Sequence, residues 1–121
     1  MNTLFVVSLV VALLFGLGFT LAPATLLSLY DVTLSANGVM VAQLFGSEVL
    51  AFAVLLWYVR RSENAEFRRG AVRAMFTYWV LGTVFLIIGQ LAGLMNVMGW
   101  GTIALHAALV VWYGLYAFKS T

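Results

Sequence analysis

Glu48 is the residue of this sequence best suited to chemistry, because it is an acid inside a long apolar stretch. It lies ten positions after Gly38 and eleven before Val59, close to the middle of that stretch. A charge in the middle of a bilayer costs at least a few kcal/mol, so we expect the side chain to point into a helix bundle and to be protonated, paired or hydrated. Such an acid either serves a function or links helices through hydrogen bonds.

Four other polar residues accompany Glu48 in apolar stretches. At 100° per residue, Gln43, Ser47 and Glu48 fall within an arc of about 140° and form one polar helix face. Gln90 and His106 lie in later stretches. We expect Gln43, Gln90 and His106 to share one depth, with Glu48 about 7 Å deeper. Such a cluster fits a proton relay, a small-substrate pocket or the polar end of a quinone site, and hydrogen bonding between helices explains the same residues without a ligand.

The inventory of metal and cofactor ligands is small. The chain has one His and no Cys, so His106 cannot supply both axial ligands of a haem, and no metal site is predicted. We predict no cofactor, with a quinone or a tetrapyrrole as the alternative. No nucleophile elbow, phosphate loop or paired carboxylates favour an enzyme, because Glu63 and Glu66 belong to a solvated loop.

The elements that must position these residues are membrane helices. Of 121 residues, 64% are hydrophobic and 8% are charged, which excludes an ordinary water-soluble domain. Four apolar stretches are long enough to cross a hydrocarbon core of about 30 Å. The sequence predicts an all-α polytopic membrane protein, a single domain over 1–121 whose four transmembrane helices form a bundle, with spans at 4–22, 38–59, 71–95 and 102–119.

The first apolar stretch resembles a secretory signal, but no Lys or Arg precedes it. We therefore expect it to be retained as a membrane helix. Pro23 ends this helix, because its ring restricts the preceding residue and it lacks a backbone donor. Residues 24–30 then predict a short helix lying at the membrane interface.

The basic residues lie on one side of the predicted membrane. Residues 60–73 carry five Arg and two Glu, and Lys119 follows the fourth span. Lys and Arg in short loops stay in the cytoplasm, so both termini and this loop are expected to face the cytoplasm across a bacterial inner membrane. Docking to anionic lipid or to an acidic partner is the alternative use of the loop. The arginines are Arg60, Arg61, Arg68, Arg69 and Arg73.

Aromatic and glycine residues fit the same arrangement. Aromatic side chains gather at both ends of the spans, as interface anchors do, although they also suit a cage for a cation or an aromatic cofactor. On the third span, Gly82, Gly89 and Gly93 fall within an arc of about 40°, which predicts close helix packing within the chain or against a second subunit. The aromatic residues are Trp57, Tyr58, Trp112, Tyr113 and Tyr116 at one end, and Tyr30 and Trp100 at the other.

Four short segments resemble the DoxX-like small bacterial membrane proteins. They are Leu-Ala-Pro at 21–23, Val-Ala-Gln-Leu-Phe-Gly at 41–46, Leu-Trp-Tyr-Val-Arg at 56–60 and Asn-Val-Met-Gly-Trp at 96–100. The resemblance covers most of the chain and implies a four-helix membrane protein. The name of that group comes from a subunit associated with quinone-linked sulfur oxidation, and the group brings no single activity or catalytic set with it.

These observations favour a non-enzymatic accessory or scaffold subunit of a larger membrane complex, respiratory or photosynthetic. The expected partners are the lipid bilayer and other membrane subunits or further copies of the chain, and no nucleic acid. The alternative is an oligomeric proton-coupled transporter of small molecules, or a quinone-binding or pigment-binding subunit, that uses Glu48 and His106.

Overall fold

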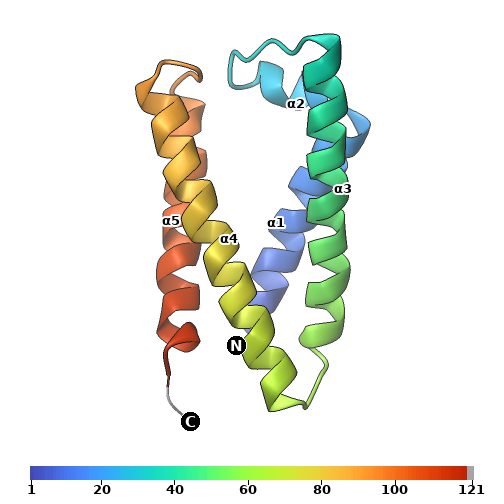
Figure 1. The fold of residues 1–121 in the computed structure, drawn as a ribbon, viewed down its shortest axis with the longest axis vertical. Helices are drawn as coiled ribbons and strands as arrows, with labels where there is room; N and C mark the ends of the chain where they lie inside the picture. Colours follow the sequence, from blue (N-terminus) through green and yellow to red (C-terminus); the bar gives the residue numbers. More distant parts are fainter. Residues whose placement is uncertain (120–121) are drawn as a thin grey trace. The chain divides into compact units, whose positions relative to one another are not determined.

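The computed structural model describes residues 1–119, and all of its regular structure is helical (Figure 1). Four of the helices are long and apolar enough to cross a membrane. The predicted all-α class and the number of spans are therefore confirmed. The helices are α1 (Asn2–Leu21), α2 (Pro23–Ser28), α3 (Ala36–Val59), α4 (Ala65–Leu91) and α5 (Met98–Ala117).

The largest difference from the predicted spans is at α4, which begins six residues before position 71 and ends four residues before position 95. Asn64 caps the early start, since its Oδ1 accepts a hydrogen bond of 2.9 Å from the Phe67 amide. At the other end Gly93 has φ +74°, and the amides of Gly93 and Leu94 donate to the carbonyls of Gln90 and Gly89. This is a Schellman turn, which ends the helix before the apolar stretch ends.

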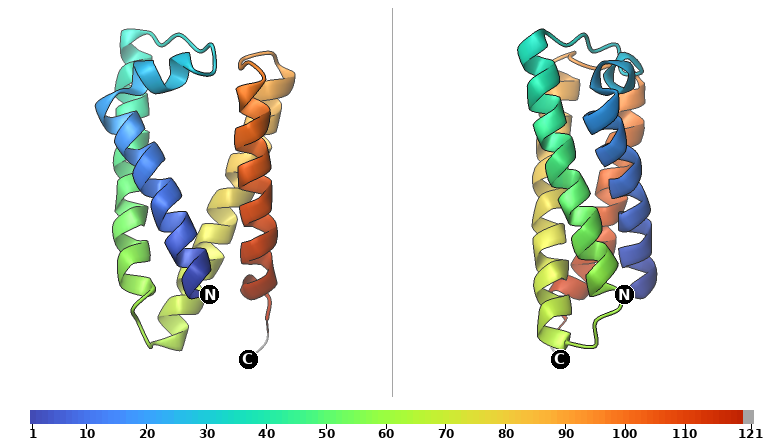
Figure 2. Two further views of the ribbon diagram at one scale, coloured as in Figure 1. Left: turned by 180° about the vertical axis from the view of Figure 1, so that it is seen from behind. Right: turned by 90° about the vertical axis from the view of Figure 1, so that its right-hand side faces the viewer.

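The predicted short helix is present as α2. Pro23 occupies its first turn, where a missing amide hydrogen costs nothing, and the Ser28 hydroxyl donates to the Thr25 carbonyl at 2.6 Å. The helix packs on α1 and α3 and runs across one end of that pair (Figure 2). Its position at a membrane interface stays a prediction.

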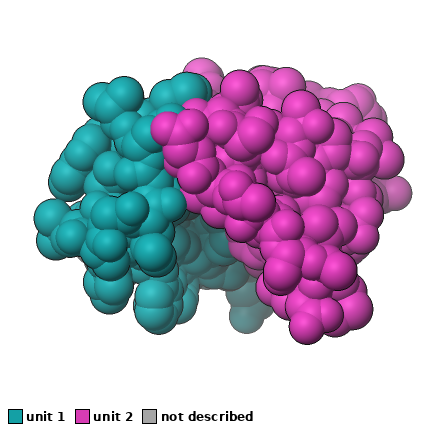
Figure 3. All heavy atoms as spheres, turned by 90° about the horizontal axis from the view of Figure 1, so that it is seen from above, with its two compact units in different colours: residues 1, 62–121 teal, residues 2–61 magenta. Residues whose placement is uncertain are grey.

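The chain divides into two compact units, which Figure 3 colours separately. The N-terminal unit, Asn2–Arg61, holds α1, α2 and α3, and the C-terminal unit holds α4 and α5. Within each unit the two long helices run antiparallel and pack on each other (Figure 1). Each unit is therefore a helical hairpin built from neighbouring segments of sequence.

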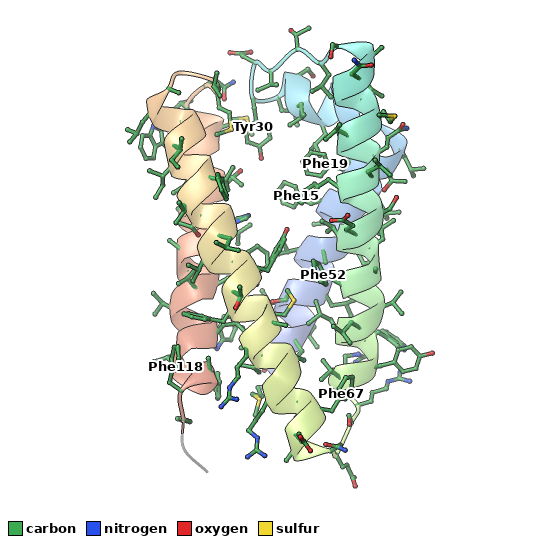
Figure 4. The ribbon with its side chains drawn as sticks, viewed as in Figure 1. Phe15, Phe19, Tyr30, Phe52, Phe67 and Phe118 are labelled. Carbon is green, nitrogen blue, oxygen red and sulfur yellow. The ribbon has the colours of Figure 1, made fainter. Side chains whose placement is uncertain are left out.

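Small side chains bring α1 and α3 together in the N-terminal unit. A Cβ atom placed on Gly46 would lie 2.7 Å from the Thr20 backbone nitrogen and 2.9 Å from the Phe19 Cβ. Phe19, labelled in Figure 4, also meets Phe45 edge to face, with 5.1 Å between ring centroids. Small residues four apart are typical of close helix packing in membranes. Those buried here are Ser8, Ala12 and Gly16 on α1, and Ala42, Gly46 and Ala53 on α3.

Within the chain, Gly82, Gly89 and Gly93 do not form the predicted continuous packing stripe, and their packing against a second subunit stays a prediction. Gly93 lies beyond the end of α4, and a Cβ atom on Gly89 would meet only the tips of Met95 and Leu94, at 3.8 and 3.9 Å. Gly82 alone makes a close contact, with His106 of α5. Gly46 was not among the packing residues predicted from the sequence, although it lies four residues from Ala42, a spacing of small residues that is typical of helix packing.

Candidate functional site

Glu48 lies on the outer face of α3 and is exposed. The buried residues of α3 form a strip that includes Gly46, Val49 and Ala53. At 100° per residue, the side chain of Glu48 leaves the helix about 120° from the centre of that strip. Within the N-terminal unit the side chain therefore points away from α1, because the smallest residues of α3 admit α1 on the other side.

Glu48 makes no hydrogen bond and no ion pair with any residue in the described range 1–119. Its two expected companions use their polar groups elsewhere. Gln43 donates from Nε2 to the Thr20 carbonyl of α1 at 3.2 Å, and the Ser47 hydroxyl donates to the Gln43 carbonyl at 3.0 Å. Gln43, Ser47 and Glu48 therefore do not form one connected polar cluster. Of the three, Glu48 alone has no hydrogen-bond or ion-pair partner among residues 1–119.

His106 is a packed residue between α5 and α4. A Cβ atom placed on Gly82 would lie 2.9 Å from its Nδ1, so the glycine makes room for the imidazole. The rings of His106 and Trp79 meet edge to face, with 4.7 Å between centroids and an interplanar angle of 87°. Both the His106 Nδ1 and the Trp79 Nε1 are enclosed without a hydrogen-bond partner in the structure.

This setting does not suit His106 as an axial ligand. A metal-bound histidine usually donates from its second ring nitrogen to an acceptor that fixes the ring, and the enclosed Nδ1 has none. Within the described residues, no three His, Asp or Glu side chains lie close enough to hold a metal ion. The geometry supports helix packing, in which Gly82 and Trp79 enclose the ring.

The side chain of Gln90 stabilises the connection between α4 and α5. Its Nε2 donates to the carbonyls of Met95, at 3.2 Å, and Asn96, at 3.0 Å, and its Oε1 lies against Gly99. Gln90 is eight residues, about 12 Å, along α4 from the glycine that contacts His106. The predicted common depth of Gln90 and His106 is therefore wrong.

Gly99→Ala should displace the Gln90 amide, because the new methyl group would occupy the place of Oε1. We expect the loss of its two hydrogen bonds to lower the free energy of unfolding by about 1–2 kcal/mol. Chemical denaturation in detergent, followed by circular dichroism, measures this value. Gly101→Ala is the matched control, since a Cβ atom there meets nothing within 4 Å. Equal stability of the two variants would contradict the role of Gln90.

The basic segment consists of a short turn followed by the start of α4. Arg60 and Arg61 end the N-terminal unit, and both guanidinium groups lie over the Trp57 ring, at 3.9 and 4.3 Å from its centroid. In the C-terminal unit, Arg68 donates to the Ser62 carbonyl, and Arg73 donates from Nε to the Ala117 carbonyl at the end of α5. Arg68 and Arg69 are thus helical, whereas a loop was expected from the sequence, and Arg73 lies in the helix as the predicted span at 71–95 requires.

Comparisons with protein-family models, with curated proteins and with solved structures found no match for this chain. The resemblance to the DoxX-like proteins therefore stays a prediction.

Proposed function

We propose that the protein is a non-enzymatic accessory subunit that assembles into a larger membrane complex through the outer face of α3. The observation that carries this proposal is the exposed Glu48, which has no partner among residues 1–119. Large apolar side chains lie beside it on the same face. These are Val41 and Leu44, each with 59% of its surface exposed.

The depth of Glu48 determines the free-energy cost of leaving its side chain in contact with lipid. It lies twelve residues from Ala36 and eleven from Val59, about 17 Å from either end of α3. An acid at this depth costs about 3 kcal/mol in contact with lipid. A neighbouring helix that presents a donor or a positive charge at the same depth removes this cost and makes assembly favourable.

The sequence points to a partner other than a second copy. All six basic residues of the chain lie at positions 60–73 and 119, and none lies in α3. A second copy that docks side by side therefore brings no cation to the depth of Glu48. We infer a partner helix of different sequence with a Lys or Arg near its centre, in keeping with the pairing of intramembrane charges. Respiratory and photosynthetic complexes are the hosts we favour.

Purification under mild conditions tests this proposal. An affinity-tagged copy expressed at its native level is extracted from membranes in a mild detergent, and the composition and mass of the product are measured. We expect other membrane proteins at constant stoichiometry to the tagged chain. Elution of the chain alone, or only with further copies of itself, would overturn the proposal.

The second candidate is an oligomeric proton-coupled transporter built around Glu48, and the exposure of this acid on α3 supports it. Glu48→Gln separates the two candidates, because it keeps the size and hydrogen-bonding capacity of the side chain but removes its titration. A transporter should lose coupled transport and keep its assembly. The enclosed His106 gives no support to quinone or pigment binding.

We further propose a bacterial inner membrane as the location, with both termini in the cytoplasm. The support is the charge asymmetry of the sequence together with an even number of spans. Single cysteines at Glu63 and Thr33, both exposed, provide the test. In intact cells, Thr33→Cys should react with an impermeant thiol reagent and Glu63→Cys should not. Labelling of Glu63→Cys from outside would reverse the orientation.

A further inference from the structure

The end of α3 holds two positive charges on one aromatic ring. Arg60 caps the helix, with its amide donating to the Leu56 carbonyl, and the Arg61 amide donates to the Tyr58 carbonyl. The backbone is therefore fixed at both residues. Both side chains return toward Trp57, one turn earlier, with their guanidinium carbons 3.9 and 4.3 Å from the ring centroid.

This arrangement leaves one charge without an anion. Arg61 is exposed, and its guanidinium makes no hydrogen bond or ion pair within residues 1–119. A guanidinium that lies over an indole keeps its N–H groups at its edge, where they can bind a planar or tetrahedral oxyanion. Two such groups over one ring make a site for an anion with several oxygen atoms.

The position of the ring identifies the source of that anion. Trp57 and Tyr58 lie in the last turn of a helix long enough to span a membrane, and 43% and 66% of their surfaces are exposed. Tryptophan and tyrosine at the end of a span lie at the level of the lipid headgroups. The phosphate groups of the bilayer lie at that same level.

We propose that Trp57, Arg60 and Arg61 form a binding site for the phosphate of an anionic phospholipid. The indole holds the two guanidinium groups together, and the lipid phosphate receives their hydrogen bonds. Retention of Arg in cytoplasmic loops explains the charges but not their gathering on Trp57. The site is independent of the partner proposed for Glu48, which lies about two and a half turns away from Trp57 on α3.

Native mass spectrometry of the full-length protein in detergent tests the site. The probes are phosphatidylglycerol and phosphatidylcholine with identical acyl chains. Each basic residue near an anionic lipid surface changes affinity about fivefold, so we expect the two arginines together to make phosphatidylglycerol bind about 25-fold more tightly. Equal binding of the two lipids would overturn the proposal. Displacement of the lipid by inorganic phosphate or by an acidic peptide at equal concentration would assign the site to those anions and overturn it as well.

Variants that conserve charge distinguish a defined binding site from general electrostatic attraction between basic residues and anionic lipid. The double variant Arg60→Lys/Arg61→Lys keeps both charges but lacks the planar forks, and we expect it to lose about fivefold in phosphatidylglycerol binding. Arg68→Lys/Arg69→Lys makes the same change in α4 and should stay within about twofold of the original protein. Trp57→Leu keeps every charge and should also lose about fivefold, and Trp100→Leu should not. If Trp57→Leu does not fold, Trp57→Phe replaces it, with an intermediate loss expected. Equal binding by both Lys pairs, or no loss without the indole, would overturn the site.

Discussion

Gly46→Ala is expected to lower the free energy of unfolding by about 2–3 kcal/mol, although alanine is the better helix former. The added Cβ would lie 2.7 Å from the Thr20 backbone nitrogen and 2.9 Å from the Phe19 Cβ. Neither atom can rotate away, so α1 and α3 must move apart over their closest contact. The packing around Gly16 would weaken with it, since a Cβ atom there would lie 3.2 Å from the Leu50 backbone nitrogen.

Two glycines with open surroundings provide the controls for Gly46→Ala. A Cβ atom on Gly70 of α4 or on Gly101 of α5 meets nothing within 4 Å. Gly70→Ala and Gly101→Ala should therefore leave stability unchanged or raise it by up to about 1 kcal/mol, through helix propensity alone. Chemical denaturation in detergent, monitored by circular dichroism, compares the three variants. A stable Gly46→Ala would mean that α1 and α3 do not pack as described.

Glu48→Leu is expected to act in opposite directions on the isolated chain and on its complex. The purified chain should become more stable by up to about 3 kcal/mol, because leucine suits the middle of a bilayer and an acid does not. The complex should lose most of its co-purifying protein. Removing one member of a buried charged pair costs about 2–5 kcal/mol, which corresponds to a drop in affinity of about thirtyfold or more.

The control for Glu48→Leu is Ala51→Leu, an enlargement at an exposed position one turn along α3. It adds an apolar side chain to the same face without removing the acid, so the complex should keep its partner at a lower yield. The readouts are the denaturation midpoint of the purified chain and the stoichiometry of the tagged complex. If the complex stays intact with Glu48→Leu, then Glu48 does not lie in the interface with the partner, and this face of α3 contacts lipid instead.

The four spans could be predicted because the length of an apolar stretch is enough to identify a membrane-spanning helix. Their ends could not, since local hydrogen bonds decide them. The cap on Asn64 adds six residues, three of them charged, to the start of α4, and an apolar stretch gives no sign of them. The turn at Gly93 ends the same helix inside an apolar stretch, and its signal was a glycine that our sequence analysis assigned to a packing stripe.

The candidate site was predicted in part. Helical periodicity placed Gln43, Ser47 and Glu48 on one face, but it cannot say which face meets a neighbouring helix. That choice depends on the small residues opposite, above all Gly46. His106 and Gln90 were expected to form one cluster because they were predicted to lie at the same depth. Instead, the side chain of Gln90 donates hydrogen bonds to the connection between α4 and α5.

The division into two consecutive hairpins has a consequence for biosynthesis. Helix α1 packs on α3, and α4 packs on α5, so each long helix finds its main partner nearby in the chain. Contacts that are local in sequence form quickly, and chains fold from the N-terminus as they are made. The contacts within Asn2–Arg61 need no residue beyond Arg61, so this hairpin can leave the insertion machinery packed while α5 is still on the ribosome.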